Sequence, residues 1–389
     1  MNEWREAILD DIASVNPPEF LKRGEAAKKI AMECLKPFIK KINEFSIEPF
    51  NGGMKFRNGD TIIARITPCL ENGKTAYVDI LDPDEIGFGS TEYIVLREKN
   101  GLSDKHFLYY YAISPEFRDV AILSMTGSSG RQRVETSVIK NHILFVPPLL
   151  EQKAIARVLF SLDDKIDLLD RQNKTLEAMA ETLFRQWFVE EADEGWEEGK
   201  LPDEFSFIMG QSPVGTSFNE NKIGIPMFQG NADFGFRFPS ERVYTTEPTR
   251  FADQFDTLVS VRAPVGEQNM ALVKCCIGRG VASFRYKHNR DYYTYTYFKI
   301  RSLLMEIRQY NDEGTVFGSI GKADFESLDI DIPPQDLIHN FERVAKPIND
   351  KIIENCGQIR TLEKLRDSLL PKLMSGEVIL EGYNHEYRF

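Results

Sequence analysis

Two short groups of charged residues have the types and spacing that metal-dependent phosphodiester hydrolysis uses. Pro202-Asp203 is followed by Glu220-Asn221-Lys222, a Pro-Asp then Glu-x-Lys arrangement that suits a divalent metal ion. Patterns this short arise often by chance, so a nuclease is kept only as an alternative.

A second candidate chemistry is methyl transfer. Asn16-Pro17-Pro18-Glu19 is similar to the Asn-Pro-Pro-aromatic motif of amino-methyltransferases, but Glu19 stands where the base-stacking ring belongs, although Phe20 follows. No convincing glycine-rich cofactor loop follows a strand and opens a helix, and no Gly-x-x-x-x-Gly-Lys-Ser/Thr sequence is present. An intrinsic methyltransferase is therefore a weak alternative, and ATP-driven work is expected elsewhere.

Composition and cysteine usage narrow the class of protein. The 389 residues are 42% hydrophobic and 28% charged, typical of a globular chain long enough for two domains. The five cysteines show no Cys-x-x-Cys spacing, and no histidine lies at ligand spacing from a cysteine pair, so no structural metal is expected. The N-terminus lacks a signal pattern and no apolar run reaches membrane length, which predicts a cytoplasmic protein without a membrane partner.

The chain contains an internal duplication. Pro147-Pro148 and Pro333-Pro334 each precede a helical run, and Asp164-Lys165-Ile166 recurs as Asp350-Lys351-Ile352. Further matches upstream pair Asp60 and Pro68 with Asp256 and Pro264, and Trp4 and Leu9 with Trp196 and Leu201. A repeat of half the chain indicates two similar modules, each a strand-rich part followed by a long helix.

The elements of the first module follow from hydrophobic spacing and turn residues. A basic stretch from Arg23 to Lys41 is expected to be helical, and Lys105–Ile113 to form another helix. Strands are expected over Thr61–Ile66, Thr75–Ile80, Tyr93–Leu96 and Asn141–Val146.

The two helical runs have the pattern of an antiparallel pair. The first spans about Leu150 to Glu191 and the second about Gln335 to Ser375, with Gly376 as a stop and Pro347 expected to kink or interrupt the second. Each helix carries one narrow apolar seam, and the seam of the first includes Asn173 and Ala180. The simplest way to bury both seams is to pack the two helices against each other.

Bulk charge does not exclude nucleic acid. The net charge is −12, but residues 147–204 hold 7 basic against 15 acidic side chains, so most of the excess lies in the first helix and its exit. Both modules are near neutral, and a local basic face remains possible on either. In that helix Asp163, Asp164, Asp167 and Asp170 form either a docking face or a solvated side.

Four motifs in register give the chain a family resemblance. The run Pro147-Pro148-Leu149-Leu150-Glu151-Gln152-Lys153-Ala154-Ile155-Ala156, then Leu162–Leu169, resembles the entry to the first spacer helix of Type I restriction–modification specificity (S) subunits. Met209–Pro213 with Ile225–Gly230 resembles the opening of a target-recognition domain, and Leu369–Val378 the end of the second spacer. The resemblance covers essentially the whole chain and is weakest over about residues 1–58.

The resemblance implies an α+β fold with two pseudo-repeated α/β target-recognition domains separated by two long antiparallel, coiled-coil spacer helices. The expected divisions are residues 1–148 and 193–334 for the domains, 149–192 and 335–376 for the spacers, and 377–389 for a tail. It also implies a bipartite double-stranded DNA target, two methyltransferase (M) subunits and restriction/translocase (R) subunits as partners, and no catalysis by this chain. S-adenosylmethionine, ATP and Mg²⁺ would lie on the partners, with no cofactor here.

Contact residues are expected in loops rich in arginine, glutamine, serine and threonine, which bind phosphates and base edges. In the first module these are Arg65, Thr67, Lys74 and the glycine-containing loop 126–133 with Ser128, Ser129, Arg131, Gln132 and Arg133. In the second module they are Gln211, Ser212, Gln229, Asn231, Arg262, Thr315, Phe317 and Ser319, with Phe317 equally suited to a core. The remaining alternative is a helical scaffold that does not bind DNA.

Overall fold

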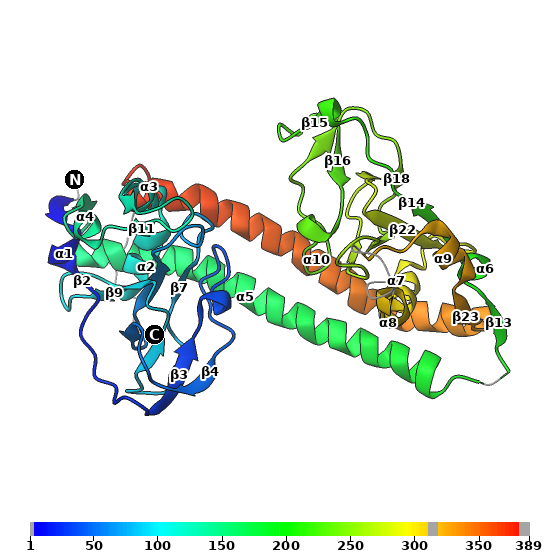
Figure 1. The fold of residues 1–389 in the computed structure, drawn as a ribbon, viewed down its shortest axis with the longest axis horizontal. Coiled ribbons are helices and arrows are strands. Elements are labelled where there is room, and N and C mark those ends of the chain that lie inside the picture. Colours follow the sequence, from blue (N-terminus) through cyan, green and yellow to red (C-terminus); the bar gives the residue numbers. More distant parts are fainter. Residues whose placement is uncertain (1–3, 194, 310–317, 381–389) are drawn as a thin grey trace. The chain divides into compact units, whose positions relative to one another are not determined.

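Two compact units make up the chain. The computed structural model describes residues 4–193, 195–309 and 318–380 (Figure 1). One unit consists of residues 1–169 with 359–389, and the other of residues 170–358. Each combines a mixed helix-and-strand part with stretches of two long helices, α5 (Leu149–Arg185) and α10 (Gln335–Met374). The predicted α+β class with two long helices is confirmed.

Unit 1 is built on two four-stranded sheets. The first is antiparallel, with the order β2 (Ala13–Val15), β9 (Tyr93–Glu98), β6 (Thr61–Ala64) and β7 (Thr75–Tyr77). The second has the order β4 (Ser46–Pro49), β3 (Ala26–Ile30), β8 (Gly87–Gly89) and β5 (Lys55–Phe56), with β3 and β8 parallel. Two smaller pairs are β1 (Arg5–Ile8) with β12 (Ile143–Val146), and β10 (Met125–Thr126) with β11 (Arg133–Val134). The helices before α5 are α1 (Leu9–Ile12), α2 (Lys105–Ile113), α3 (Pro115–Leu123) and α4 (Thr136–Lys140).

Unit 2 repeats this plan. Its antiparallel sheet has the order β14 (Phe205–Met209), β22 (Val281–Tyr286), β19 (Thr257–Ser260) and β20 (Gln268–Met270). A second sheet contains β15 (Phe218–Asn219), β17 (Tyr244–Thr245), β16 (Ile225–Phe228), β21 (Cys275–Ile277) and β18 (Phe251–Ala252), with β16 and β21 parallel. β13 (Glu197–Lys200) pairs with β23 (Asp329–Ile332) as β1 pairs with β12. The helices before α10 are α6 (Leu201–Glu204), α7 (Tyr293–Ser302), α8 (Leu304–Gln309) and α9 (Lys322–Ser327).

A buried ion pair recurs in both units and explains two anchors of the sequence repeat. Asp60 precedes β6 and accepts two hydrogen bonds of 2.6 Å from Arg97 on β9. Asp256 precedes β19 and accepts a 2.6 Å hydrogen bond from Nε of Arg285 on β22, as well as one from Nη2. Because each carboxylate is almost wholly buried, its arginine is the partner that makes burial tolerable.

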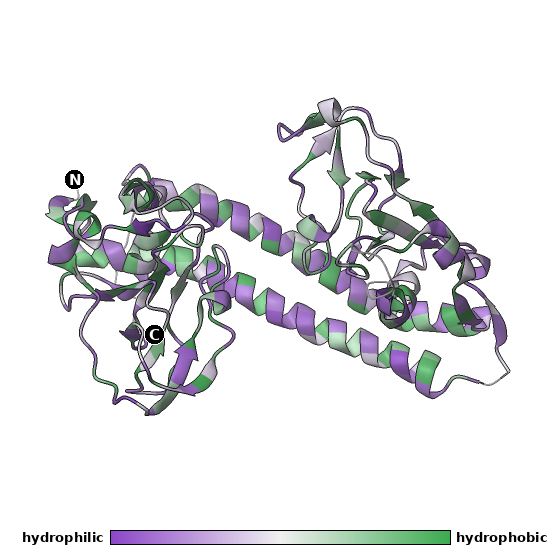
Figure 2. Ribbon diagram, in the orientation of Figure 1, coloured by the Kyte–Doolittle hydropathy of each residue, from purple (hydrophilic) through white to green (hydrophobic). Residues whose placement is uncertain are grey.

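The two long helices pack antiparallel in each unit. In unit 1 Asp163 of α5 contacts Arg366 of α10 at 2.8 Å, and in unit 2 Asn173 contacts Cys356 at 3.6 Å. Phe188, just beyond α5, packs on Phe341 with ring centroids 5.2 Å apart. Along these three pairs the residue number on the α5 side rises from 163 to 173 to 188, while that on α10 falls from 366 to 356 to 341. Equal and opposite steps are what an antiparallel pairing requires. Figure 2 shows hydrophilic and hydrophobic residues alternating along both helices, as a shared apolar seam requires.

Polar contacts lie inside the helix pairing. Asp163 also accepts a 2.6 Å hydrogen bond from the hydroxyl of Tyr110, and Asn355 donates to Asn173 at 2.9 Å. All four of Asp163, Tyr110, Asn173 and Asn355 are buried. A buried polar pair in a helical seam is satisfied in one register only, so the Asp163–Arg366 and Asn173–Asn355 contacts fix the alignment of α5 on α10. The Tyr110 hydrogen bond ties α5 to α2 instead.

Two sequence predictions are wrong. The stretch from Arg23 to Lys41 is not helical but contains β3 and a 3₁₀ turn at Met32–Cys34. Its lysines are matched by carboxylates on neighbouring segments, since Lys28 pairs with Asp82 and Glu85 at 2.9 Å. Helix α10 also runs through Pro347, so the interruption predicted there does not occur; Pro347 and residue 343, whose carbonyl loses its helical donor, are both exposed.

Other expectations hold with small shifts in their ends. α2 spans the predicted Lys105–Ile113, whereas β6 and β7 end two and three residues early. Gly376 adopts φ +74° just after α10, as expected of a stop. No helix in the described ranges combines the length and the apolar character that crossing a membrane requires.

Unit 2 contains a buried carboxyl with no counterpart in unit 1. Glu204 is 2% exposed and accepts a 2.7 Å hydrogen bond from Tyr295. By the register of the paired strands, the equivalent positions in unit 1 are the apolar Ile12 and Phe107. Burial raises the pKa of Glu204 to about 7, although the charge of Lys299 and the Tyr295 hydrogen bond act in the opposite direction.

This shift makes unit 2 less stable as pH rises. The folded carboxyl keeps its proton up to about pH 7, whereas the unfolded one loses it near its ordinary value, so the free energy of unfolding falls between these pH values. Replacing Glu204 with Gln removes that titration. We expect the unfolding free energy of E204Q minus that of the parent to increase by about 2–3 kcal/mol from pH 4.5 to pH 8 in urea titrations. E247Q, at an exposed site, is the control, and a pH-independent difference for E204Q would contradict the assignment.

Candidate nucleic-acid interface

In unit 1 the loop predicted to contact DNA, residues 126–133, lies beside the residues that follow β6, which we call the central strand of this unit. It joins β10 to β11, and the backbone N–H of Thr67 donates to the carbonyl of Gln132 at 3.0 Å. The N–H of Val134 donates to the carbonyl of Arg65 at 2.9 Å, and Ile66 pairs with Arg133. Arg65, Thr67, Gln132 and Arg133, predicted separately from the sequence, therefore come together.

The tip of this loop is polar and exposed. Ser128, Ser129 and Arg131 all face solvent, and the N–H of Arg131 closes the turn on the carbonyl of Ser128 at 3.0 Å. Gly127 and Gly130 have φ values of +121° and +77°, which other residues adopt with strain. The glycines therefore let a short loop present two hydroxyls and a guanidinium at one edge of the unit.

Arg133 is held in place by a carboxylate. Its Nε lies 2.9 and 3.0 Å from the two oxygens of Glu92, and its Nη2 lies 2.7 Å from Oε1. The hydrogen bond from Arg133 lowers the pKa of Glu92. The guanidinium remains 45% exposed, so it is oriented without being buried.

Two predicted contact residues, Arg65 and Lys74, donate hydrogen bonds to backbone carbonyls of unit 1. Arg65 donates from Nη2 to the carbonyl of Val134 at 3.2 Å, and its Nε is buried without a partner. Lys74 donates to the carbonyl of Met32 at 2.9 Å. Their side chains thus support neighbouring backbone, a role that residue type alone does not reveal.

In unit 2 a loop pairs in the same way with the residues that follow β19, the central strand of this unit. The N–H of Ile320 donates to the carbonyl of Val261 at 3.1 Å, and Arg262 pairs with Ser319 as Ile66 pairs with Arg133. Arg262 and Ser319 are both exposed. Thr315 and Phe317, predicted in the same loop, lie outside the described residues.

The remaining predicted residues of unit 2 gather around a tight turn that follows β21. The N–H of Gln211 donates to the carbonyl of Ile277 at 3.0 Å, and Ser212 accepts from the N–H of Arg279 at 3.2 Å. A Cβ on Gly280 would lie 2.2 Å from the carbonyl oxygen of Gln229, so only glycine allows this approach. Asn231 begins a 3₁₀ turn two residues later.

The exposed Arg279 was missed by the sequence analysis. It sits between Gly278 and Gly280, and the N–H of Val261 donates to the carbonyl of Gly280 at 2.9 Å, which brings the turn next to Arg262. The Gly-Arg-Gly pattern is the sequence signal that could have identified Arg279 as an exposed turn residue. Unit 2 therefore presents two exposed arginines with serine and glutamine side chains.

Several residues of the catalytic alternatives bind neighbouring groups of the chain. Asp203 accepts the N–H of Lys200 at 2.7 Å, while Glu220 faces Arg242 at 3.9 Å. Asn16 accepts the N–H of Val95 at 2.9 Å, and Glu19 pairs with Arg57 and Arg97. Among the described residues, no group of three or more histidine, cysteine or acidic side chains could hold a metal ion. The arrangement suits binding through hydrogen bonds and charge.

The acidic run on α5 is largely paired within unit 1. Besides the Asp163 contacts, Asp164 binds Lys40 at 2.9 Å and Asp167 binds Lys41 at 3.0 Å. These ion pairs tie the helix to the segment after β3.

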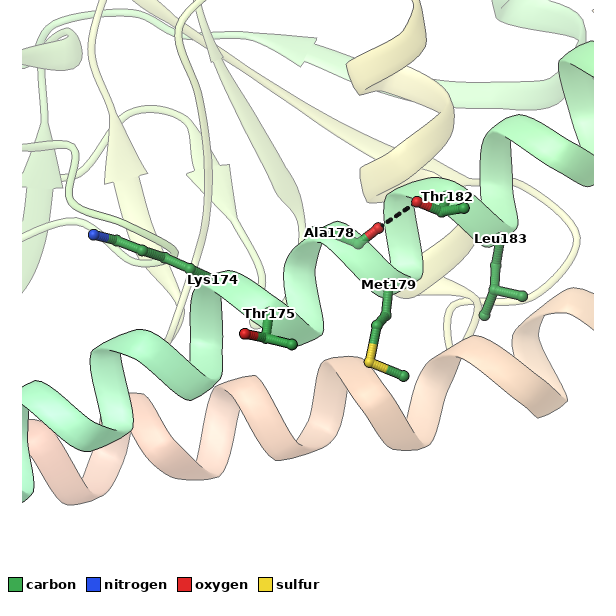
Figure 3. Close-up of a pocket in the computed structure, with 6 residues that line it drawn as sticks. All are labelled: Lys174, Thr175, Ala178, Met179, Thr182 and Leu183. Carbon is green, nitrogen blue, oxygen red and sulfur yellow. Dashed lines mark hydrogen bonds between the residues drawn. The ribbon is translucent and has the colours of Figure 1, made fainter.

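An apolar hollow lies farther along α5, in unit 2 (Figure 3). Its lining includes Met179, which is 50% exposed, with Ala178 and Leu183. Thr182, which also lines it, donates to the carbonyl of Ala178 at 2.8 Å. This part of the helix offers apolar surface that the unit itself does not cover.

Sequence comparisons identify related proteins. A family model described as "Type I restriction modification DNA specificity domain" matches residues 1–178. The chain is 30% identical over 339 residues to the putative type I restriction enzyme MjaX specificity subunit of Methanocaldococcus jannaschii, covering 82% of this chain and 78% of that protein. It is 32% identical over 206 residues to the EcoAI specificity subunit of Escherichia coli, covering 50% of this chain and 35% of that protein.

The fold is also shared with a solved structure. The type I restriction–modification S subunit from M. genitalium superposes with a TM-score of 0.59 at 16% identity, covering 96% of each chain. At this identity the likeness concerns the fold alone.

The ion pair that orients Arg133 is testable by proteolysis. Trypsin cleaves after arginine, and Arg131 and Arg133 bracket the end of the loop. We expect E92Q to increase cleavage after Arg133 at least about three-fold relative to cleavage after Arg131, because a neutral amide holds the guanidinium less strongly. Peptide mapping by mass spectrometry measures both sites, with exposed E44Q as control. An unchanged ratio would show that Glu92 does not restrain the loop.

Proposed function

The chain belongs to the type I restriction enzyme specificity subunits, and we propose that it reads a bipartite double-stranded DNA sequence, one half-site with each unit. Specificity subunits are non-catalytic DNA-recognition subunits, and this chain is one of them. The two half-sites, the partners and the residues in contact with DNA are the content of the proposal.

One observation carries it: the same edge of both units bears an exposed polar cluster. In each unit a loop pairs with the residues just past the central strand, Ile66 with Arg133 in one and Arg262 with Ser319 in the other. Two domains that bind different DNA sequences need the same backbone arrangement with different side chains. Arginine and glutamine can bind base edges, while hydroxyls and backbone N–H groups bind phosphates.

We assign residues 1–148 and 193–334 to the two target-recognition domains, and residues 149–192 and 335–376 to the spacers, with a tail after them. A helix advances about 1.5 Å per residue, so helix length converts directly into the separation of half-sites on the duplex. Reading one face of DNA favours a separation near one turn, about 34–36 Å, or another matching phase. The buried polar contacts between the helices support this role, since a spacer must not slip.

The chain is also proposed to assemble two methyltransferase subunits and the restriction/translocase subunits. S-adenosylmethionine, ATP and Mg²⁺ then belong to those partners. The uncovered apolar surface around Met179 on α5 supports a protein contact in unit 2, because exposed apolar patches mark association sites.

The direct test is single-molecule methylation sequencing of DNA from cells that express the neighbouring methyltransferase gene with and without this chain. We expect a split methylated motif that appears only when the chain is present. Exchanging residues 205–332 for those of a relative should change one half-site and leave the other intact. If partner expression is confirmed and no chain-dependent methylation appears, the scaffold alternative replaces DNA reading.

Individual contacts can be classified by salt dependence. In the assembled complex we expect R131Q and R279Q to weaken binding of the methylated motif's duplex. Loss of a phosphate contact makes the slope of log K against log salt shallower by about 0.9, irrespective of sequence. Loss of a base contact costs about 1–3 kcal/mol at one half-site only. R157Q, exposed on α5, is the matched control, and unchanged binding by both variants would remove these residues from the interface.

A further inference from the structure

Unit 1 contains a cavity that DNA reading does not use. It has a volume of about 540 Å³ and lies where the N-terminal strand, the start of α5 and the end of α10 meet. Its walls include Trp4, Phe145, Met374 and Ile379, and its acidic residues are Glu116 and Glu151. A volume in the range of ligand pockets, with apolar walls and few polar groups, is typical of a specific binding site.

One oxygen of the Glu151 carboxylate is buried and unsatisfied. The residue is 1% exposed, and its Oε2 has no hydrogen-bond partner. No ion pair to it is found within the described residues of unit 1. Buried carboxylates in folded proteins are nearly always paired with a cation or with hydrogen-bond donors, so this one lacks a group that its position calls for. Glu116, by contrast, is half-exposed and lies 3.4 Å from His142.

The internal repeat shows that the other unit has no carboxylate at the equivalent position. The strand register matches Val146 to Ile332, which aligns Pro147-Pro148 with Pro333-Pro334 and Glu151 with Leu337. In the same alignment Phe145 corresponds to Asp331. The fold thus accommodates leucine at the first turn of the long helix, and the combination of buried acid and aromatic wall is particular to unit 1.

The aromatic walls are themselves positioned. Gly376 has φ +74°, and a Cβ there would lie 3.3 Å from Cζ2 of Trp4, so the indole packs closely over this glycine. Phe145 and Ile379 remain 64% and 60% exposed. Large apolar side chains left open around a buried charge are the features of a protein-contact anchor site, in which one deeply inserted residue dominates.

We propose that this cavity receives an arginine side chain from a partner polypeptide. Its guanidinium would donate to the Glu151 carboxylate while its plane stacks on Trp4 or Phe145. Arginine fits better than lysine because its flat fork matches both a carboxylate and an aromatic face. The site is independent of the DNA-contact loops, so it stands or falls separately from the proposed function.

The test uses the full chain labelled with 5-fluorotryptophan and observed by ¹⁹F NMR. The three tryptophan resonances are assigned with single Trp→Phe variants. The probe is Nα-acetyl-arginine amide, and its neutral near-isostere Nα-acetyl-citrulline amide is the control. We expect a saturable shift of the Trp4 resonance in the millimolar range with the arginine probe, at least ten-fold weaker with citrulline, and none at Trp196.

Variants locate the interaction. E151Q should weaken arginine binding at least ten-fold, whereas E116Q, at the more exposed acid, should weaken it no more than about three-fold. A Trp4 resonance of probe-free E151Q that coincides with that of the parent reports that unit 1 of the variant is folded. Equal binding of citrulline, a shift that persists in E151Q, or no saturable shift of Trp4 would each overturn the proposal, and the first and third need no variant.

Discussion

The alignment of α5 on α10 is the constraint on which the other features depend. Each unit takes a stretch of both helices into its core, so a slip of the pair would disturb the core of each unit. An apolar seam alone tolerates slippage by whole turns. The Asp163–Arg366 contact and the Asn173–Asn355 hydrogen bond exist in one alignment only. Slippage would leave those groups buried and unpaired, at a cost of several kcal/mol.

Duplication supplied one frame that the two units use differently. The carboxylate before the central strand and its arginine are kept, as Asp60 with Arg97 and Asp256 with Arg285. Elsewhere whole pairs have been exchanged: Ile12 and Phe107 in one unit correspond to Glu204 and Tyr295 in the other. The paired change gives the buried Tyr295 hydroxyl an acceptor in Oε1 of Glu204, which neither single change would do. Contacts at the loop ends differ freely because they face solvent.

The sequence was sufficient where a feature depends on local pattern or on the repeat. The long helices, α2 and the glycine turn at 127–130 follow from spacing and residue type. The stretch from Arg23 to Lys41 failed because its strand depends on Glu48, Asp82 and Glu85, which lie far along the chain. Lys74 was counted as a surface cation for the same reason, since the carbonyl that engages it belongs to Met32. Arg279 was missed because its neighbours meet only after β14, β16 and β21 are assembled.

The pairing of Arg133 with Glu92 bears on how a chain of net charge −12 could read DNA. A free arginine gains affinity from any phosphate. An arginine already bound by a carboxylate must give up that ion pair to bind DNA, so a nonspecific phosphate contact adds little affinity. Only a well-placed acceptor such as a guanine edge makes up for the lost ion pair. In the proposed interface the same pairing would orient the guanidinium before DNA binds and so reduce the entropy lost on binding. An interface built this way favours discrimination over affinity, and it leaves most of the nonspecific attraction to be supplied by partner subunits.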